Sequence, residues 1–231
     1  NQTILSGEID SNSSLWSLNV VSGANLDANT TLDGFRITKG NANGASGTFY
    51  VNGGGAYLKD SHLSLINLIF NNNSASGSGG GSFSTYDLNL TNCVFTNNSA
   101  YYGGGIFSPS INLNNCVFTN NSAVGYGGGV SGDGTITNCV FINNSASIKG
   151  GGVRGNGIFI GCIFTSNSAR DYGGGVQGDG SFTNCVFNNN SVSDYGNGGG
   201  ISGGISSSSL NLTNCVFTNN SAVGYGGGVS G

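Results

Sequence analysis

Three turns of the chain hold the polar residues whose types come closest to a reactive site. The segments SGDG, RGNG and QGDG place Asp133, Asn156 and Asp179 at equivalent points, 23 residues apart, with Arg154 beside this column. Carboxylates grouped with a basic residue can hold Ca²⁺ or an acidic sugar, and they can cleave polysaccharides. Asp-Gly and Asn-Gly are also common turn formers. The alternative is therefore that these residues only form turns.

Other signs of catalysis in the sequence are weak. His62 is the one histidine, and no serine is paired with a base. The EF-hand and nonapeptide calcium motifs are absent from the sequence. If the three turns are stacked, Asp133 and Asp179 lie roughly 9–10 Å apart. We therefore predict that the protein is not an enzyme and needs no metal or cofactor. The alternative is a carbohydrate-binding or polysaccharide-degrading protein.

Aromatic residues form a second candidate site, because tyrosines recur just before blocks of three glycines. The stripe comprises Tyr102, Tyr126, Tyr172 and Tyr225, with Lys149 at the same place in one repeat and Tyr195 nearby. Tyrosine rings present an apolar face and a polar hydroxyl, which suits contact with a glycan or a partner protein. The alternative is that these rings only stack on one another at a turn.

Composition limits the classes of protein to which the chain belongs. Of 231 residues, 44 are Gly and 7% are charged, and the net charge is −4. The 36% of hydrophobic residues is more than a disordered chain carries. There is no basic stretch for nucleic acid and no apolar run of the roughly 20 residues that a membrane helix needs. These features predict a folded domain outside both classes.

A repeat of about 23 residues organises the chain. In copies such as NCVFTNNSA (115–123), apolar residues alternate with polar ones, which is the pattern of a strand. Asn115 breaks the alternation, and Asn is a residue that tolerates positive φ. We expect a left-handed bend there, and by the same logic another at the Asn column three residues after each Phe. The repeat predicts coils of three short strands, stacked in parallel.

Two ladders are expected inside such a stack, because equivalent residues of successive coils lie above one another. The aromatic ladder is Phe95, Phe118, Phe141, Phe164, Phe187 and Phe217. The amide ladder is Asn98, Asn121, Asn144, Asn167, Asn190 and Asn220. Stacked asparagines can exchange side-chain amide hydrogen bonds.

Residues on either side of each Phe are expected to point outward and to form a flat face. This face comprises Val94, Thr96, Val117, Thr119, Val140, Ile163, Thr165, Val186, Val216 and Thr218. A regular apolar strip can pack on another chain, and flat Val/Thr arrays resemble the faces of ice-binding solenoids. Val and Thr are also simply good strand formers.

Six cysteines lie in one column, two residues before each Phe: Cys93, Cys116, Cys139, Cys162, Cys185 and Cys215. Neighbours in register would have Cβ atoms about 4.8 Å apart, beyond the roughly 3.8 Å that a disulfide prefers. The sequence has no Cys-x-x-Cys pair or Cys/His cluster of the kind that binds zinc. We expect buried free thiols, with strained disulfides and metal binding as the alternatives.

The alternation of Phe-x-x-Asn with Gly-Gly-Gly-(Val/Ile) resembles the polymorphic outer-membrane-protein repeat of bacterial surface proteins. The opening segments TILSGEID (3–10) and TLDGFRITKGNANG (31–44) are similar to that family as well. The resemblance implies a right-handed parallel β-helix that is secreted or surface-exposed, with a structural or adhesive role. A signal peptide would then have been removed.

We expect one β-helix domain over 1–231, with 1–33 as an irregular first coil or cap and 34–231 as repeat coils. The segments 41–52 and 193–209 are expected to be loops. The predicted function is a non-catalytic extracellular β-helix with a structural or adhesive role, which binds a cell-surface glycan or its own copies. The segment NCVFTNNSAVGYGGGVSG occurs at 115–132 and again at 214–231. Its last strand suggests an open edge and head-to-tail filaments.

Overall fold

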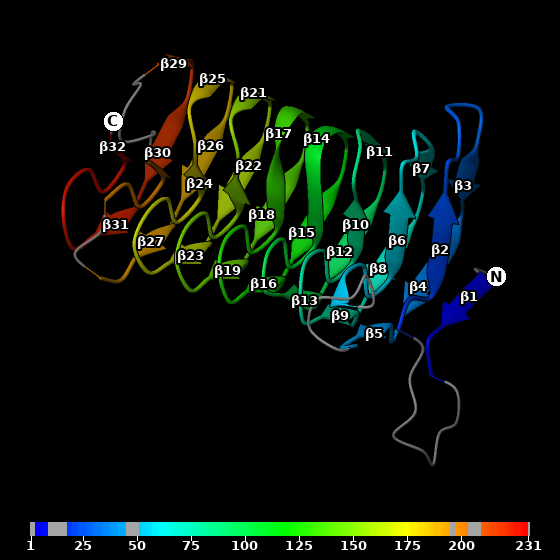
Figure 1. The fold of residues 1–231 in the computed structure, drawn as a ribbon. Coiled ribbons are helices and arrows are strands. Elements are labelled where there is room, and N and C mark those ends of the chain that lie inside the picture. Colours follow the sequence, from blue (N-terminus) through cyan, green and yellow to red (C-terminus); the bar gives the residue numbers. More distant parts are fainter. Residues whose placement is uncertain (1–2, 9–17, 45–50, 195–196, 203–208, 231) are drawn as a thin grey trace.

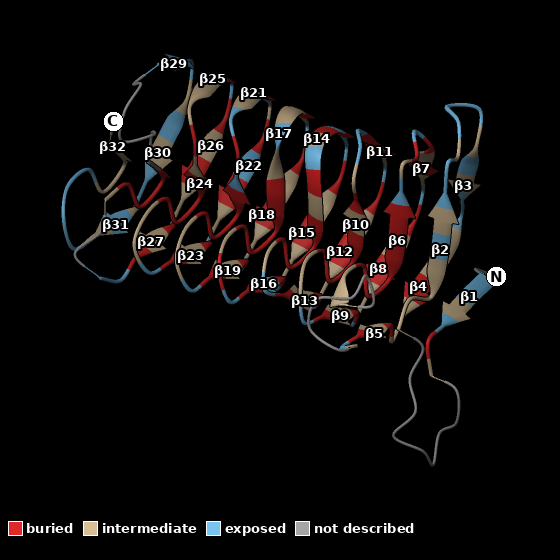
Figure 2. Cartoon of the chain, in the orientation of Figure 1, coloured by how far each residue is buried: buried red, intermediate tan, exposed pale blue. Residues whose placement is uncertain are grey.

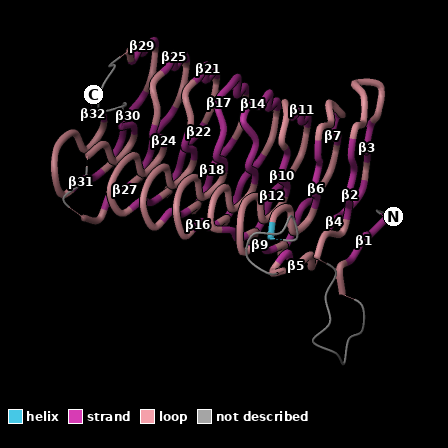
Figure 3. Tube along the Cα trace, viewed as in Figure 1, coloured by secondary structure: helices cyan, strands magenta, loops and turns pink. Residues whose placement is uncertain are grey.

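The computed structural model describes residues 3–8, 18–44, 51–194, 197–202 and 209–230. Strands of successive coils pair in parallel and build three long sheets. Figure 1 shows the coils stacked along one axis, with the two ends of the chain at opposite ends of the stack. In Figure 3, short strands alternate with turns in each coil. The chain is a right-handed parallel β-helix, as predicted.

The first sheet contains the Phe ladder and has nine strands. Its strands, in spatial order, are β1 (Thr3–Ser6), β4 (Phe35–Thr38), β8 (Ile69–Asn71), β12 (Val94–Thr96), β15 (Val117–Thr119), β18 (Val140–Ile142), β22 (Ile163–Thr165), β26 (Val186–Asn188) and β30 (Val216–Thr218).

The third sheet is narrow, with eight strands of two residues each. Its strands are β5 (Asn41–Ala42), β9 (Ser74–Ala75), β13 (Ser99–Ala100), β16 (Ser122–Ala123), β19 (Ser145–Ala146), β23 (Ser168–Ala169), β27 (Ser191–Val192) and β31 (Ser221–Ala222).

The second sheet has fifteen strands in two columns. The column after the glycine blocks is β2 (Val21–Ala24), β6 (Ala56–Lys59), β10 (Ser82–Ser84), β14 (Ile106–Asn114), β17 (Val130–Thr137), β20 (Val153–Arg154), β24 (Val176–Gln177), β28 (Ile201–Ser202) and β32 (Val229–Ser230). The other column adds β3 (Thr31–Asp33), β7 (Ser64–Ile66), β11 (Leu88–Thr91), β21 (Gly157–Ile160), β25 (Gly180–Thr183) and β29 (Leu210–Thr213). The long strands β14 and β17 join the two columns.

The register follows the sequence repeat. Phe118 pairs with Phe95 on one side and with Phe141 on the other, so residues 23 apart in the chain lie on neighbouring strands. Between Phe187 and Phe217 the step is longer, because extra residues enter between the coils without changing the register. A shift by one residue would move Phe out of the core, so this ladder fixes the register.

The core is a set of buried columns inside the three sheets. Phe rings stack face to face along the axis, for example Phe118 on Phe141 with 4.8 Å between centroids. In most first-sheet strands the middle residue is buried and its neighbours are partly exposed, and Figure 2 shows this alternation in colour. The Cys column lies beside the Phe column in the same core. Each coil therefore buries its apolar residues against the two coils next to it.

The first predicted bend is confirmed, and the second needs a correction. Asn115 has a φ of 53°, and equivalent residues in other coils are also left-handed. At the second corner the left-handed residue is Asn97 or its equivalent, with a φ of 55°, and not Asn98 as expected. The adjacent Asn98 is fully buried, because its side chain is needed inside the core.

The buried asparagines form the expected ladder. The amide oxygen of Asn144 accepts two hydrogen bonds from Asn121, one from the backbone N–H and one from Nδ2, both at 3.0 Å. Asn144 in turn donates two hydrogen bonds to Asn167 at 3.0 Å. Its Nδ2 also donates to the carbonyl of Phe118 at 2.9 Å. Each amide thereby joins three coils and satisfies backbone groups that the turn leaves without strand partners.

The glycine blocks permit close packing of the backbone at the turn between the third and second sheets. A Cβ atom on Gly129 would lie 2.6 Å from the carbonyl oxygen of Gly152 and 3.2 Å from the Phe141 ring. No side chain fits at that distance. The glycine block is therefore needed for close packing of the coils, and it is not a flexible linker.

Two of the predicted boundaries differ from the structure. The segments 41–52 and 193–209 were expected to be loops, but each contains a strand, β5 and β28, that pairs with its neighbours. In the segment 1–33, strands β1, β2 and β3 pair in register with later coils. Residues 45–50 and 203–208 of the predicted loops lie outside the described residues.

Candidate functional site

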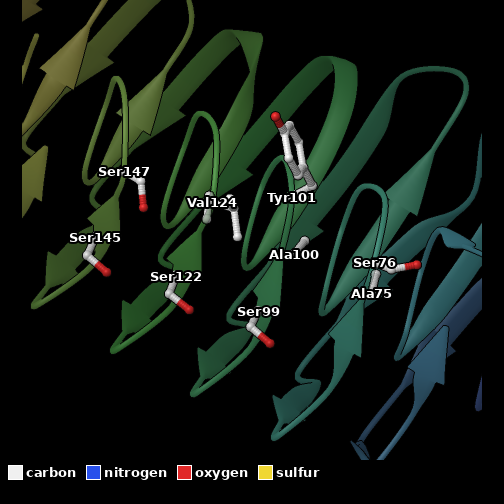
Figure 4. Close-up of a pocket in the computed structure, with 10 residues that line it drawn as sticks. Ala75, Ser76, Ser99, Ala100, Tyr101, Ser122, Val124, Ser145 and Ser147 are labelled. Carbon is white, nitrogen blue, oxygen red and sulfur yellow. The ribbon is translucent and has the colours of Figure 1, made fainter. Parts of the chain in front are cut away.

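A shallow hollow on the third sheet, with an aromatic wall, is a candidate site in the described part of the chain. Its volume is about 330 Å³, and it crosses four coils. It is lined by Ala75, Ser76, Ser99, Ala100, Tyr101, Ser122, Ala123, Val124, Ser145 and Ser147. Figure 4 shows Ser99, Ser122 and Ser145 in a row along successive strands. The floor is thus an array of serine hydroxyl groups, and the alanines next to them in the strands are buried.

Tyr101 supplies the aromatic wall of this hollow, and the sequence analysis did not select it. Its side chain is 42% exposed, and its ring meets the edge of Tyr102 at 82° with 4.6 Å between centroids. Val124, in the next coil, is 59% exposed. An exposed ring next to hydroxyl groups is an arrangement that suits a sugar ring. The signal in the sequence is the Tyr-Tyr pair before the glycine block, which occurs in one coil only.

The predicted tyrosine stripe is arranged along the axis, but its rings contact one another. Tyr102 stacks on Tyr126 with 5.3 Å between centroids and 21° between planes. Lys149 lies over the ring of Tyr172 at 5.0 Å. One face of these rings is therefore covered within the column. Tyr225 is 80% exposed, and Tyr195 lies outside the described residues.

The predicted outward face is present as a row of partly exposed side chains on the first sheet. Val117 and Thr119 flank the buried Phe118, and Ile163 is 40% exposed. Ile142 and Asn188 interrupt the row of threonines. From β8 to β30 the row measures about 29 by 10 Å, or roughly 300 Å², against about 800 Å² per partner in a stable interface. A packing or ice-binding role for this row stays a prediction.

Side chains of the predicted polar column accept hydrogen bonds from the backbone of the next coil. The carboxylate of Asp133 accepts a hydrogen bond from the backbone N–H of Asn156 at 2.8 Å. The side chain of Asn156 accepts one from the N–H of Asp179 at the same distance. Arg154 is exposed and lies in register with Ser131 and not with Asp133. Asp133 lies within β17, while Asn156 and Asp179 directly precede β21 and β25, so each contact joins one coil to the next.

The six cysteines are free, and five of them are buried. Cys116 donates its backbone N–H to the sulfur of Cys139 at 3.3 Å. Among the described residues, no three His, Cys, Asp or Glu side chains are grouped so that they could hold a metal ion. Hydrogen bonding with the Cys116 thiol, followed by burial, raises the pKa of Cys93 and of Cys139. A raised pKa keeps these thiols uncharged near neutral pH.

We predict that Cys139 resists alkylation in the native protein at pH 8, because the thiolate is the reactive form and its raised pKa disfavours it. Iodoacetamide labelling followed by mass spectrometry measures this, and unfolding in urea should make the same thiol reactive. Ser122→Cys, on the third sheet, is the exposed control and should react at once. Rapid labelling of Cys139 in the folded protein would contradict the buried ladder.

Comparison with known families adds to this geometry. A sequence model of the Chlamydia polymorphic membrane protein repeat matches residues 92–109 and 115–133. These two segments are similar to that repeat. The matched segments are parts of two neighbouring coils that contain Phe95, Asn98 and the following glycine block, which are the residues that carried the resemblance. No curated protein and no solved structure matches the chain.

The polymorphic membrane protein repeat suggests an outer-membrane or surface location. This agrees with the predicted location at the cell surface. In the matched coils, its Phe, Asn and Gly positions form the core and turns described above. The repeat therefore explains the scaffold and the serines at the floor of the hollow, while the position of Tyr101 and Val124 varies between coils. Within the described residues, no helix is both long and apolar enough to cross a bilayer.

Proposed function

We propose that this chain is a non-catalytic, extracellular β-helix with an adhesive role, which contacts glycans through the hollow on the third sheet. The observation that carries the proposal is Tyr101, a half-exposed ring at the wall of a hollow whose floor presents Ser99, Ser122 and Ser145. Neutral sugars offer hydroxyl groups to the serines and an apolar ring face to the tyrosine. The family of the repeat supports the surface location.

The geometry suits an extended ligand better than a compact one. The serines lie on successive strands, so the same hydroxyl group recurs at about 4.8 Å along the axis. That step is comparable with the length of one pyranose ring in a polysaccharide chain. Weak contacts of this kind gain strength by repetition when several are made at once. Adhesion to a glycan-coated surface needs only such multiple contacts.

The test is binding of the purified chain to a glycan array. Tyr101→Ala should weaken binding roughly tenfold, as expected for loss of one aromatic contact. Tyr86→Ala is the matched control, because Tyr86 is 46% exposed and lies outside the hollow. Equal binding by both variants and the native chain, or no binding to any glycan, would contradict the proposal.

The same preparation tests the non-catalytic part of the proposal. Incubation with acidic polysaccharides, with and without Ca²⁺, should release no shorter fragments. The side chains of Asp133 and Asn156 support this expectation, since they accept hydrogen bonds from the turns of the next coil. Release of fragments that is lost on Asp133→Asn would favour a polysaccharide-degrading enzyme. Head-to-tail filaments stay a prediction from the sequence, and no described contact bears on them.

A further inference from the structure

In the described part of the chain, each coil passes from the first sheet to the third at one corner residue with positive φ. In six coils this residue is an asparagine, and we call these six the corner asparagines: Asn72, Asn97, Asn120, Asn143, Asn189 and Asn219, with φ of 53–55°. Ser166 (φ 55°) and Lys39 (φ 60°) hold the equivalent place in the two other described coils. All six corner asparagines are exposed.

The corner asparagines share a second feature, which is a serine two residues later. In β13, Ser99 follows Asn97 at this distance, and Ser122 in β16 follows Asn120 in the same way. Asn-x-Ser is the acceptor sequence for N-linked carbohydrate. Within the described residues, the side chains of Asn97, Asn120 and Asn143 make no hydrogen bond, so their carboxamides project from the turn without a structural partner.

We propose that the corner asparagines are acceptor sites for N-linked sugars. In the reaction, Nδ2 of the asparagine forms a bond to the anomeric carbon of a sugar that is held on a diphosphate donor. The bond between that carbon and the diphosphate oxygen breaks, and the diphosphate leaves. The proton lost from Nδ2 passes to a base of the transferase, a separate enzyme. The chain supplies only the acceptor. The serines Ser99, Ser122 and Ser145 of these acceptor sequences also line the hollow, so sugars on the corner asparagines would stand beside it.

The third-sheet strand supplies the serine in each coil from β9 to β31, Ser168 included. The asparagine before it is what completes the acceptor sequence, and the other left-handed corner lacks this sequence. Asn92 and Asn115 have the same conformation, with φ of 55° and 53°. The residues two positions later are Val94 and Val117, which give no acceptor sequence. Ser166 also shows that the second corner forms without asparagine. The two corners of one coil therefore offer an internal comparison between an asparagine that turns the chain and one that also presents an acceptor.

The stacking of the coils limits how much carbohydrate the corner can carry. Corner asparagines of neighbouring coils lie about 4.8 Å apart, which leaves little room for branched sugars on Asn97, Asn120 and Asn143 together. We therefore expect single sugars or short chains, with incomplete occupancy of adjacent corners. Asn89 and Asn211 also begin acceptor sequences, but they lie within strands β11 and β29 and are not part of the proposal.

Mass spectrometry of peptides from the chain isolated from its native source tests the proposal. We expect sugar masses on corner asparagines and none on Asn92, Asn115 or Asn138. Detection of all six corner asparagines in unmodified form only would overturn it. Modification of Asn92 or Asn115 would overturn it as well, since these residues lack the serine.

Variants of the serine separate the acceptor from the fold. Ser122→Ala, expressed in the native source, should abolish modification at Asn120 and leave Asn97 and Asn143 modified. Ser122→Thr should keep the sugar on Asn120. Ser168→Ala is the matched control, because it changes the same strand position in the coil whose corner is Ser166. A sugar that persists on Asn120 in Ser122→Ala would refute the assignment.

Discussion

Replacement of Asn144 by alanine is expected to lower the free energy of unfolding by on the order of 4 kcal/mol, because at least two buried polar groups lose their partners at about 1–3 kcal/mol each. The backbone N–H and the Nδ2 of Asn121 lose their acceptor. The amide oxygen of Asn167 loses the Nδ2 donor of residue 144 and keeps the backbone N–H donor. Water has no access to this site, since Asn144 is fully buried. Urea unfolding followed by circular dichroism measures the loss.

The neighbouring residue gives a control for this prediction. Asn143 is left-handed and exposed, so Asn143→Gly keeps the conformation and removes a side chain outside the ladder. Its effect should stay within about 0.5 kcal/mol, as for most surface changes. A small effect of Asn144→Ala, similar to that of the control, would show that the ladder does not stabilise the coil.

A charged replacement adds a pH signature to the same experiment. Asn144→Asp places a carboxyl group where burial disfavours the ionised form and raises its pKa above that of the unfolded chain. The stability of this variant relative to the native chain is then greatest in acid. It falls as the pH rises through the folded-state pKa, because only the unfolded chain ionises freely. A loss that does not change with pH would argue against burial of this side chain.

Replacement of Phe141 by alanine is the second large effect, with an expected loss of about 3–5 kcal/mol for a buried aromatic residue. Phe141 is fully buried and stacks on Phe118 and Phe164, with 4.8 Å between centroids on each side. The cavity would therefore interrupt the aromatic column in the middle of the stack. Ile142→Thr is the matched control, since neighbouring strands carry Thr119 and Thr165 at this place.

The loss at Phe141 should also be local. Each coil contacts mainly the coils next to it, so stability is close to a sum over neighbouring pairs. Hydrogen exchange measured by mass spectrometry should show faster exchange in β15, β18 and β22 than in β8. Uniform acceleration along the whole chain would instead show that the β-helix unfolds as one unit.

Much of the fold was predictable because the same residues recur at the same place. The recurrence of Phe95, Phe118 and Phe141 predicts an interior column, and the asparagines that follow them predict the ladder. The position of the second bend was not predictable, since Asn97 and Asn98 are adjacent and chemically identical. Only the pairing in the structure shows that Asn98 turns inward and that Asn97 carries the positive φ.

The candidate site was less predictable than the scaffold. Tyr101 belongs to no column, so a search for repeated residues passed over it. The stripe of Tyr102 and Tyr126 drew attention instead, although these rings cover one another. Sequence repetition reveals what supports the stack and which serines form the floor of the hollow, but the wall depends on Tyr101 and Val124, which differ between coils. Contacts between coils decide which of these side chains are left accessible.

The identical spacing of Asn98, Asn121, Asn144 and Asn167 has an evolutionary consequence. Every interface between these coils uses the same hydrogen bonds at the same distances. Loss of 23 consecutive residues by unequal recombination would join two coils that already match, and gain of 23 residues would do the same. The number of coils is thus free to vary between descendants of one gene, while the cross-section of the molecule stays constant.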